Sequence, residues 1–135
     1  MNHYRSGYES QIGQDLVLRN IDFEFEKQTF DYVSGVRGGV CMECGSKKTG
    51  KNRKYTPDFI IPRDGPFKDL IVEAKGRFPS TDRSKMRDVR KANPDLDIRM
   101  LFQKRSKAQM LIISTWCEKF GFKYAFGSFV PEEWL

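Results

Sequence analysis

The chain has 135 residues, of which 39% are apolar and 13% are aromatic. This length predicts one domain spanning residues 1–135, and the composition supplies a core and excludes a wholly disordered chain. No apolar run of about 18 residues occurs, so we expect no membrane-spanning helix. The first residues lack the apolar stretch of a secretory signal, and three cysteines cannot make a disulfide framework. We therefore expect a reducing, cytoplasmic compartment.

Basic residues outnumber acidic ones, with 24 Lys and Arg against 18 Asp and Glu and a formal net charge of +6. Basic domains often bind polyanions, and clustering strengthens that interpretation. The basic residues form three groups around one acidic centre, which indicates an enzyme of nucleic acids. The groups are Lys47, Lys48, Lys51, Arg53 and Lys54; Arg77, Arg83, Lys85, Arg87, Arg90 and Lys91; and Lys104, Arg105 and Lys107.

The first predicted element is a helix. Ser6 and Glu9 form the S-x-x-E pattern of a capping box, and apolar residues then recur at four-residue spacing from Tyr8 to Leu16. We expect this helix to end near Asn20.

Extended segments and a long bridge follow the first helix. Residues 21–25 alternate between apolar and acidic side chains, which predicts a half-buried strand, and Phe30 and Tyr32 indicate a second one. Residues 34–54 are rich in glycine and predict a bridge or loop insertion, whose length calls for a functional explanation.

The middle of the chain predicts a pair of strands. Residues 55–61 read as extended, with Pro57 at their start, and residues 62–66 read as a turn. Residues 70–72 are continuously apolar, which is typical of a central strand.

Helices and strands alternate in the last part of the chain. Ser80 is expected to cap a basic helix that ends before Pro94. Residues 98–102 predict a strand, Gly121 predicts the end of the next helix, and residues 122–126 predict a last strand. The predicted fold class is a mixed α/β domain with a central sheet.

One motif carries chemistry. Pro57-Asp58 and Glu73-Ala74-Lys75 spell the pattern PD…ExK. Two strands joined by a turn would bring the two carboxylates together, and a hard divalent cation such as Mg²⁺ would relieve their repulsion. Lys75 shares a strand face with Glu73, where an ammonium group could orient the attacking water, lower its pKa or stabilise charge in the transition state. The pattern favours a metal-dependent nuclease over the alternative of an ordinary surface triplet.

Six short sequence blocks are spread along nearly the whole chain. In their sequence and their order they resemble the phage endonuclease I family of Holliday-junction resolvases, within the PD-(D/E)xK nuclease superfamily. The blocks are RSGYE at 5–9, YTPDF at 55–59, VEAKG at 72–76, NPDLDIR at 93–99, CEKFG at 117–121 and PEEW at 131–134. The resemblance implies a restriction-endonuclease-like α/β fold with a mixed central sheet flanked by helices. It also implies an intertwined homodimer that exchanges residues 5–33.

The resemblance also implies residue roles. Asp58 and Glu73 would bind the metal with the backbone carbonyl of Ala74, and Lys75 would be the catalytic lysine. Glu9 matches the family's fourth catalytic residue, a candidate ligand of a second metal that would act in trans to the other three. Without the resemblance, helix capping alone would be the default role of Glu9. The implied cofactor is Mg²⁺ or Mn²⁺, and the implied place of action is the bacterial host cell if the protein is encoded by a phage.

The predicted function is a structure-selective endonuclease that resolves four-way junctions and other branched DNA by paired symmetric cuts. One alternative is a nicking or restriction-like nuclease on the same fold. The other is a non-catalytic, zinc-bearing module that binds DNA junctions.

The zinc alternative depends on Cys41 and Cys44, whose CxxC spacing followed by glycine resembles a zinc knuckle. Four thiolates from two chains of a dimer would complete a structural zinc site, whereas two unliganded cysteines in a basic loop are the competing interpretation. Ten basic residues are predicted to contact DNA phosphates, against the alternative of a solvated surface. They are Lys47, Lys48, Lys51, Arg53, Lys54, Arg83, Lys85, Arg87, Lys104 and Arg105.

Overall fold

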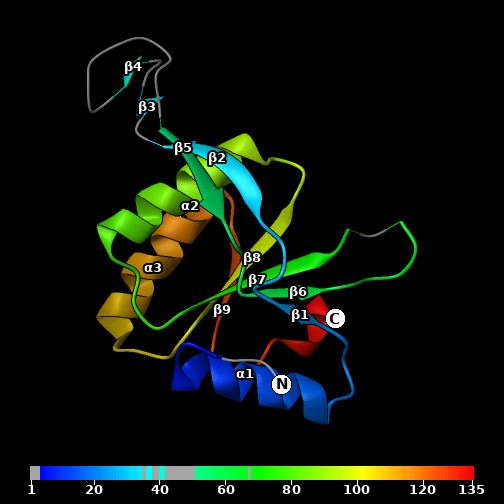
Figure 1. Ribbon diagram of the computed structural model, residues 1–135. Helices are drawn as coiled ribbons and strands as arrows, with labels where there is room; N and C mark the ends of the chain where they lie inside the picture. Colours follow the sequence, from blue (N-terminus) through cyan, green and yellow to red (C-terminus); the bar gives the residue numbers. More distant parts are fainter. Residues whose placement is uncertain (1–3, 35, 38–39, 42–50, 67) are drawn as a thin grey trace.

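The computed structural model describes residues 4–34, 36–37, 40–41, 51–66 and 68–135. Its main sheet has the strand order β1-β6-β7-β8-β9 (Figure 1). Strands β1, β6 and β7 are antiparallel, whereas β7, β8 and β9 are parallel, so the predicted mixed sheet is confirmed. The strands are β1 (Glu24–Phe25), β6 (Phe59–Ile61), β7 (Leu70–Lys75), β8 (Asp97–Phe102) and β9 (Lys123–Phe126).

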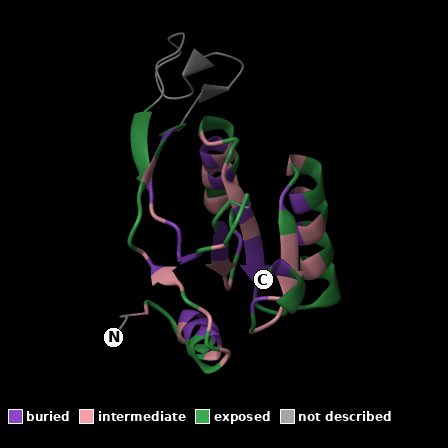
Figure 2. Cartoon of the chain, turned by 90° about the vertical axis from the view of Figure 1, so that its right-hand side faces the viewer, coloured by how far each residue is buried: buried purple, intermediate pink, exposed green. Residues whose placement is uncertain are grey.

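Helices cover both faces of this sheet. Helix α1 (Gly7–Leu18) and the C-terminal 3-10 turn η1 (Glu132–Trp134) lie on one face, and helices α2 (Ser80–Ala92) and α3 (Lys107–Phe120) lie on the other (Figure 1). Figure 2 shows that the buried residues gather in the sheet and on the helix faces turned toward it. None of the helices in the described residues is long and apolar enough to cross a membrane.

Alternation along β7 divides the core and also orients the polar residues that follow. Leu70 and Val72 pack in the cluster on the α1 side, whereas Ile71 packs in the cluster on the α2 and α3 side. Because side chains alternate between the faces of a strand, Glu73 and Lys75 fall on the same side as Ile71. The apolar strand thus delivers two charged side chains to the face that α2 covers.

A two-stranded ribbon stands apart from the main sheet. Strands β2 (Phe30–Ser34) and β5 (Lys51–Tyr55) pair in antiparallel register, and the short strands β3 (Val36–Arg37) and β4 (Val40–Cys41) form a further pair. The prediction of a loop over residues 34–54 is therefore wrong for residues 34, 36–37, 40–41 and 51–54, which lie in strands. The ribbon is stable because its strands satisfy each other's backbone groups and because Tyr32 and Tyr55 are buried against α2.

Three other boundaries differ from the predictions. The segment 55–61 is divided, since Pro57 has no N–H to donate and three residues separate β5 from β6. The strand expected over 21–25 is reduced to its last two residues. Ser80 does not cap α2, because the extended residue before it, Pro79, is the N-cap and supplies no side-chain hydrogen bond.

Two helix ends follow the predictions. The Ser6 side chain caps α1 by accepting a hydrogen bond from the N–H of Glu9. Gly121 ends α3 in the left-handed conformation, with φ of 74°, and its N–H bonds back to the carbonyl oxygens of the last helical turn.

Candidate active site

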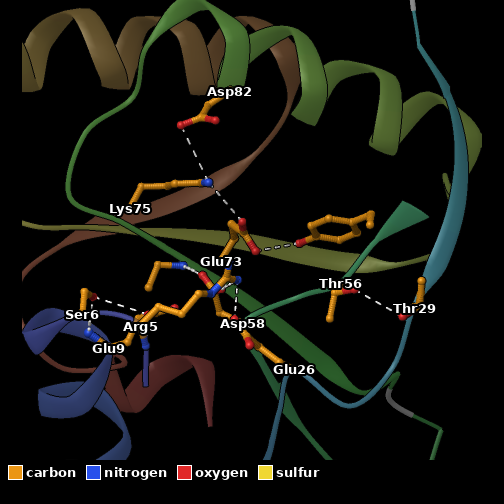
Figure 3. A network of polar contacts seen from close by, with 12 residues as sticks. Arg5, Ser6, Glu9, Glu26, Thr29, Thr56, Asp58, Glu73, Lys75 and Asp82 are labelled. Carbon is orange, nitrogen blue, oxygen red and sulfur yellow. Dashed lines mark hydrogen bonds and ion pairs between the residues drawn. The ribbon is translucent and has the colours of Figure 1, made fainter. Parts of the chain in front are cut away.

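The two carboxylates of the PD…ExK motif meet through strand pairing. Asp58 directly precedes β6, whose residue Phe59 pairs with Val72 of β7, so Asp58 lies beside Glu73 and Ala74. The N–H of Ala74 donates a hydrogen bond of 2.9 Å to Asp58 Oδ2 (Figure 3). Asp58 and Glu73 are only 5% and 4% exposed. The prediction that the turn between the strands brings these two acids together is confirmed.

Glu9 reaches the same place from the first turn of α1. It lines one pocket with Asp58 and Glu73, and it is itself buried. Its Oε1 also accepts a 3.0 Å hydrogen bond from the backbone N–H of Arg5. Glu9 therefore belongs to the helix cap and to the pocket at once. In the single chain, Glu9 lines the pocket together with Asp58 of the same chain. The action of Glu9 in trans stays a prediction, since a dimer that exchanges residues 5–33 would form the same contacts between its two chains.

Glu73 is held between a tyrosine and a lysine. The buried hydroxyl of Tyr55 donates a 3.0 Å hydrogen bond to Glu73 Oε1, and Lys75 Nζ lies 3.3 Å from Glu73 Oε2 (Figure 3). Lys75 Nζ is also 3.8 Å from Asp82 Oδ2 at the start of α2. Burial lowers the pKa of Lys75, but the charges of Glu73 and Asp82 outweigh burial and raise it overall. Lys75 is therefore a fixed cation at neutral pH.

The environment of Asp58 disfavours a negative charge. Burial raises its pKa most, and the neighbouring charge of Glu73 raises it further, whereas the hydrogen bond from Ala74 lowers it. The result is a pKa of about 8. A bound cation would favour the ionised form of this carboxylate, because its positive charge offsets both burial and the charge of Glu73. Such a carboxylate is therefore typical of a functional site.

Glu26 is an acidic residue of the site that the sequence did not indicate. Its N–H donates a 3.1 Å hydrogen bond to the carbonyl oxygen of Asp58, and its φ of 51° is in the left-handed region. Oxygen atoms of Glu9, Glu26 and Asp58 lie within 4.8 Å of one another. Such a set of carboxylate oxygens fits a hard divalent cation.

Arg5 is the second residue that the sequence did not indicate as part of the site. Its guanidinium group forms an ion pair with Glu26, and Nη2 lies 3.6 Å from Asp58 Oδ1 (Figure 3). Arg5 is thus an internal counter-ion for the acidic cluster. Arg5 belongs to the block RSGYE, but the sequence pattern indicates no role for Arg5 itself. Only the pairing of β1 with β6 reveals that Glu26 lies beside Asp58.

The predicted metal ligands differ in how free their oxygen atoms are to bind a cation. Glu9 and Asp58 belong to the close acidic cluster, whereas the oxygens of Glu73 are engaged by Tyr55 and Lys75. At Ala74 the recorded contact is made by the N–H, so the carbonyl ligand remains a prediction. The pocket that contains them has a volume of about 270 Å³. Its lining is Arg5, Ser6, Glu9, Thr56, Asp58, Glu73, Ala74, Lys75 and Lys85.

The predicted DNA-contacting residues are distributed over several elements. Lys85 lines the pocket, with Nζ 5.7 Å from the centre of the Tyr55 ring. Lys51, Arg53 and Lys54 are exposed on β5, where Lys54 pairs with Asp31. Arg83 and Arg87 lie on α2, and Lys104 and Arg105 follow β8. Lys47, Lys48 and Cys44 lie outside the described residues, as does the side chain of Cys41, so the zinc prediction is not tested.

A buried acidic cluster beside a fixed lysine, on a basic α/β domain, defines an enzyme site suited to a polyanionic substrate, as in a nuclease. Sequence comparison agrees with this class: the chain belongs to the phage endonuclease I family, whose model matches residues 1–135. It is 32% identical over 136 residues to "Endonuclease I" of Escherichia phage T7, covering 98% of this chain and 78% of that protein. It is 30% identical over 126 residues to "Endodeoxyribonuclease 1" of Enterobacteria phage T3, covering 90% of this chain and 70% of that protein. The predicted family is confirmed.

Proposed function

We propose that this protein is a metal-dependent endonuclease that resolves four-way DNA junctions by paired symmetric cuts. The observation that carries the proposal is the convergence of Glu9, Asp58, Glu73 and Lys75 on one pocket, from α1 and from two adjacent strands. The names of the T7 and T3 relatives support an endonuclease that acts on DNA. The PD-(D/E)xK arrangement of the acids and the lysine supports hydrolysis of a phosphodiester.

The acidic residues are proposed to hold Mg²⁺ or Mn²⁺. Asp58 would bind the ion together with Glu73 and the carbonyl of Ala74, and Glu9 would serve a second ion. When bound, such an ion polarises the phosphate and activates water.

Two residues of the chain support the chemistry without binding the metal. Lys75 is protonated and held by Glu73, so it can stabilise the negative charge that develops on the phosphate. Tyr55 fixes the orientation of Glu73 through its buried hydroxyl group.

The proposed active form is a homodimer that exchanges residues 5–33. Resolution of a four-way junction needs two cuts at symmetric positions, and a dimer with a two-fold axis places two pockets in a fixed relation. The exchanged segment would carry α1 and β1, and Glu9 would then complete the pocket of the other chain. Recognition would depend on the shape of the branch and on contacts with phosphates, because the residues that line the pocket are mostly charged.

The test is cleavage of a labelled four-way junction and of a linear duplex of matched sequence in Mg²⁺. Wild type should make paired cuts near the branch and leave the duplex intact, and Glu73→Ala should abolish cleavage. Glu132→Ala is the matched control, since Glu132 is exposed on η1, outside the pocket. Equal cutting of the duplex, or cuts only at nicks and flaps, would favour the alternative nucleases. Tight junction binding without cleavage in Mg²⁺ or Mn²⁺ would favour a non-catalytic module, and metal analysis for zinc at Cys41 and Cys44 would follow.

A further inference from the structure

A second pocket lies beside the candidate active site. It is enclosed by the segment after β7, the start of α2 and one face of α3, and its volume is about 490 Å³. Among the described residues that line it, none is acidic, in contrast to the active-site pocket. Its principal lining residues are Arg77, Arg83, Arg105, Phe78, Ile112 and Ile113.

Two of the arginines are anchored in the same way. Arg83 Nε donates a 3.0 Å hydrogen bond to the carbonyl oxygen of Phe78, and Arg105 Nε donates to the carbonyl oxygen of Gly76. Within the described part of the chain, neither guanidinium group forms an ion pair with a carboxylate. One N–H of each group is thus used for positioning, and the two Nη atoms remain available. A guanidinium held in this way presents paired donors that match two oxygens of a phosphate.

The position of the pocket relates it to the chemistry. Arg77 is two residues beyond Lys75, so their Cα atoms are at most about 7 Å apart. A DNA strand advances about 3.4 Å along the helix axis per nucleotide. Successive phosphates of one strand are farther apart than this axial rise, because the strand also winds around the axis. A strand whose scissile phosphate lies at Lys75 would therefore place a phosphate one or two nucleotides away within reach of Arg77.

The floor of the pocket suits the rest of a nucleotide. Phe78 and Ile113 line the pocket and are buried, and the Arg83 guanidinium lies 5.8 Å from the centre of the Phe78 ring, whereas Ile112 is 54% exposed. An apolar floor under a cationic rim accommodates a deoxyribose with its phosphate at the rim. A pocket meant only for a small inorganic anion would not need this apolar surface.

We propose that the Arg77–Arg83–Arg105 pocket binds a backbone phosphate of the cleaved DNA strand, one or two nucleotides from the bond that is cut. This inference rests on the proposed function and adds to it a defined subsite that sets the register of the strand over Asp58 and Glu73. The apolar floor receives the adjoining sugar.

The test couples protein variants to single neutralised phosphates. Junctions carry one methylphosphonate at successive positions on each side of the mapped cut, and their Kd values are measured in EDTA, where binding is separated from cleavage. For wild type, one position one or two nucleotides from the cut should weaken binding about tenfold or more, because hydrogen bonds to charged groups are lost. For Arg83→Gln and Arg105→Gln, the same methylphosphonate should weaken binding by less than about twofold, since the contact is already absent.

Matched variants separate this contact from a structural role of the arginines. Lys123→Gln removes one positive charge at the start of β9, at the opposite end of the parallel strands from Lys75, and should keep the wild-type response to every methylphosphonate. Arg83→Lys and Arg105→Lys keep the charge, should fold as judged by thermal melting, and should recover part of the response. The slope of log K against log salt concentration should decrease by about one unit, the contribution of one phosphate contact, in the glutamine variants only.

Two outcomes would overturn the proposal. One is a methylphosphonate scan of wild type with no loss of affinity within two nucleotides of the cut. The other is additive losses in the glutamine variants, which would show that the arginines act elsewhere or only hold the loop. Both differ from a failure of the proposed function, in which wild type would not cut the junction at all.

Discussion

Asp58→Asn is expected to stabilise the metal-free protein while it abolishes cleavage. Asp58 is buried beside the charge of Glu73, and its pKa is raised to about 8. Asparagine retains an oxygen that can accept the hydrogen bond from Ala74, yet it carries no charge. The substitution therefore removes a buried charge and its repulsion by Glu73, and it keeps the hydrogen bond between the strands.

The magnitude follows from the linkage between protonation and folding. The pKa of Asp58 is about 8 in the folded protein, against the ordinary value of 3.8. Between these values the folded state holds a proton that the unfolded state has released, so the unfolding free energy falls as pH rises. The fall is about 1.4 kcal/mol per pH unit, or about 4 kcal/mol between pH 4 and pH 7. The stability gain of Asp58→Asn should grow over that window from near zero to at most this amount.

Urea unfolding in EDTA at a series of pH values between 4 and 8 measures this difference. Asp64→Asn is the control, because Asp64 is exposed in the turn between β6 and β7 and its substitution should leave the difference near zero. Addition of Mg²⁺ should then stabilise wild type more than Asp58→Asn, since only the charged site gains from the cation. If Asp58→Asn is less stable than wild type at pH 7 in EDTA, the argument from buried repulsion is refuted.

Three further predictions concern neighbouring contacts. Tyr55→Phe removes the hydroxyl group that orients Glu73, and single-turnover cleavage should slow about tenfold or more while junction affinity is unchanged. Arg5→Gln removes the internal counter-ion near Asp58, so Mn²⁺ binding measured by calorimetry should tighten by up to about fivefold; weaker binding would contradict this and show that Arg5 positions the carboxylates. Burial raises the pKa of Asp97, but two arginines outweigh burial and lower it overall, so Asp97→Asn should lower the melting temperature at pH 7 and have less effect as pH falls through the folded pKa; an effect independent of pH would contradict this.

Elements that depend on local rules can be predicted from the amino-acid sequence alone. Ser6 with Glu9 specified the start of α1, and Gly121 specified the end of α3, because a side-chain cap and a left-handed residue depend only on neighbours within one turn. The PD…ExK motif also indicated its own geometry. The two strands are close in sequence and pair in antiparallel register, so Asp58 and Glu73 lie side by side.

Contacts between different helices and strands become visible only in the folded chain. Nothing in the local pattern distinguished Glu26 from Glu24, and only the pairing of β1 with β6 places Glu26 beside Asp58. The strand at 51–54 likewise forms because a distant partner, β2, supplies its hydrogen bonds. The charge state of Asp58 also depends on burial and on Glu73. Burial, pairing partners and the field of neighbouring charges are properties of the assembled chain, because each is set by residues that are far apart in sequence and close in space.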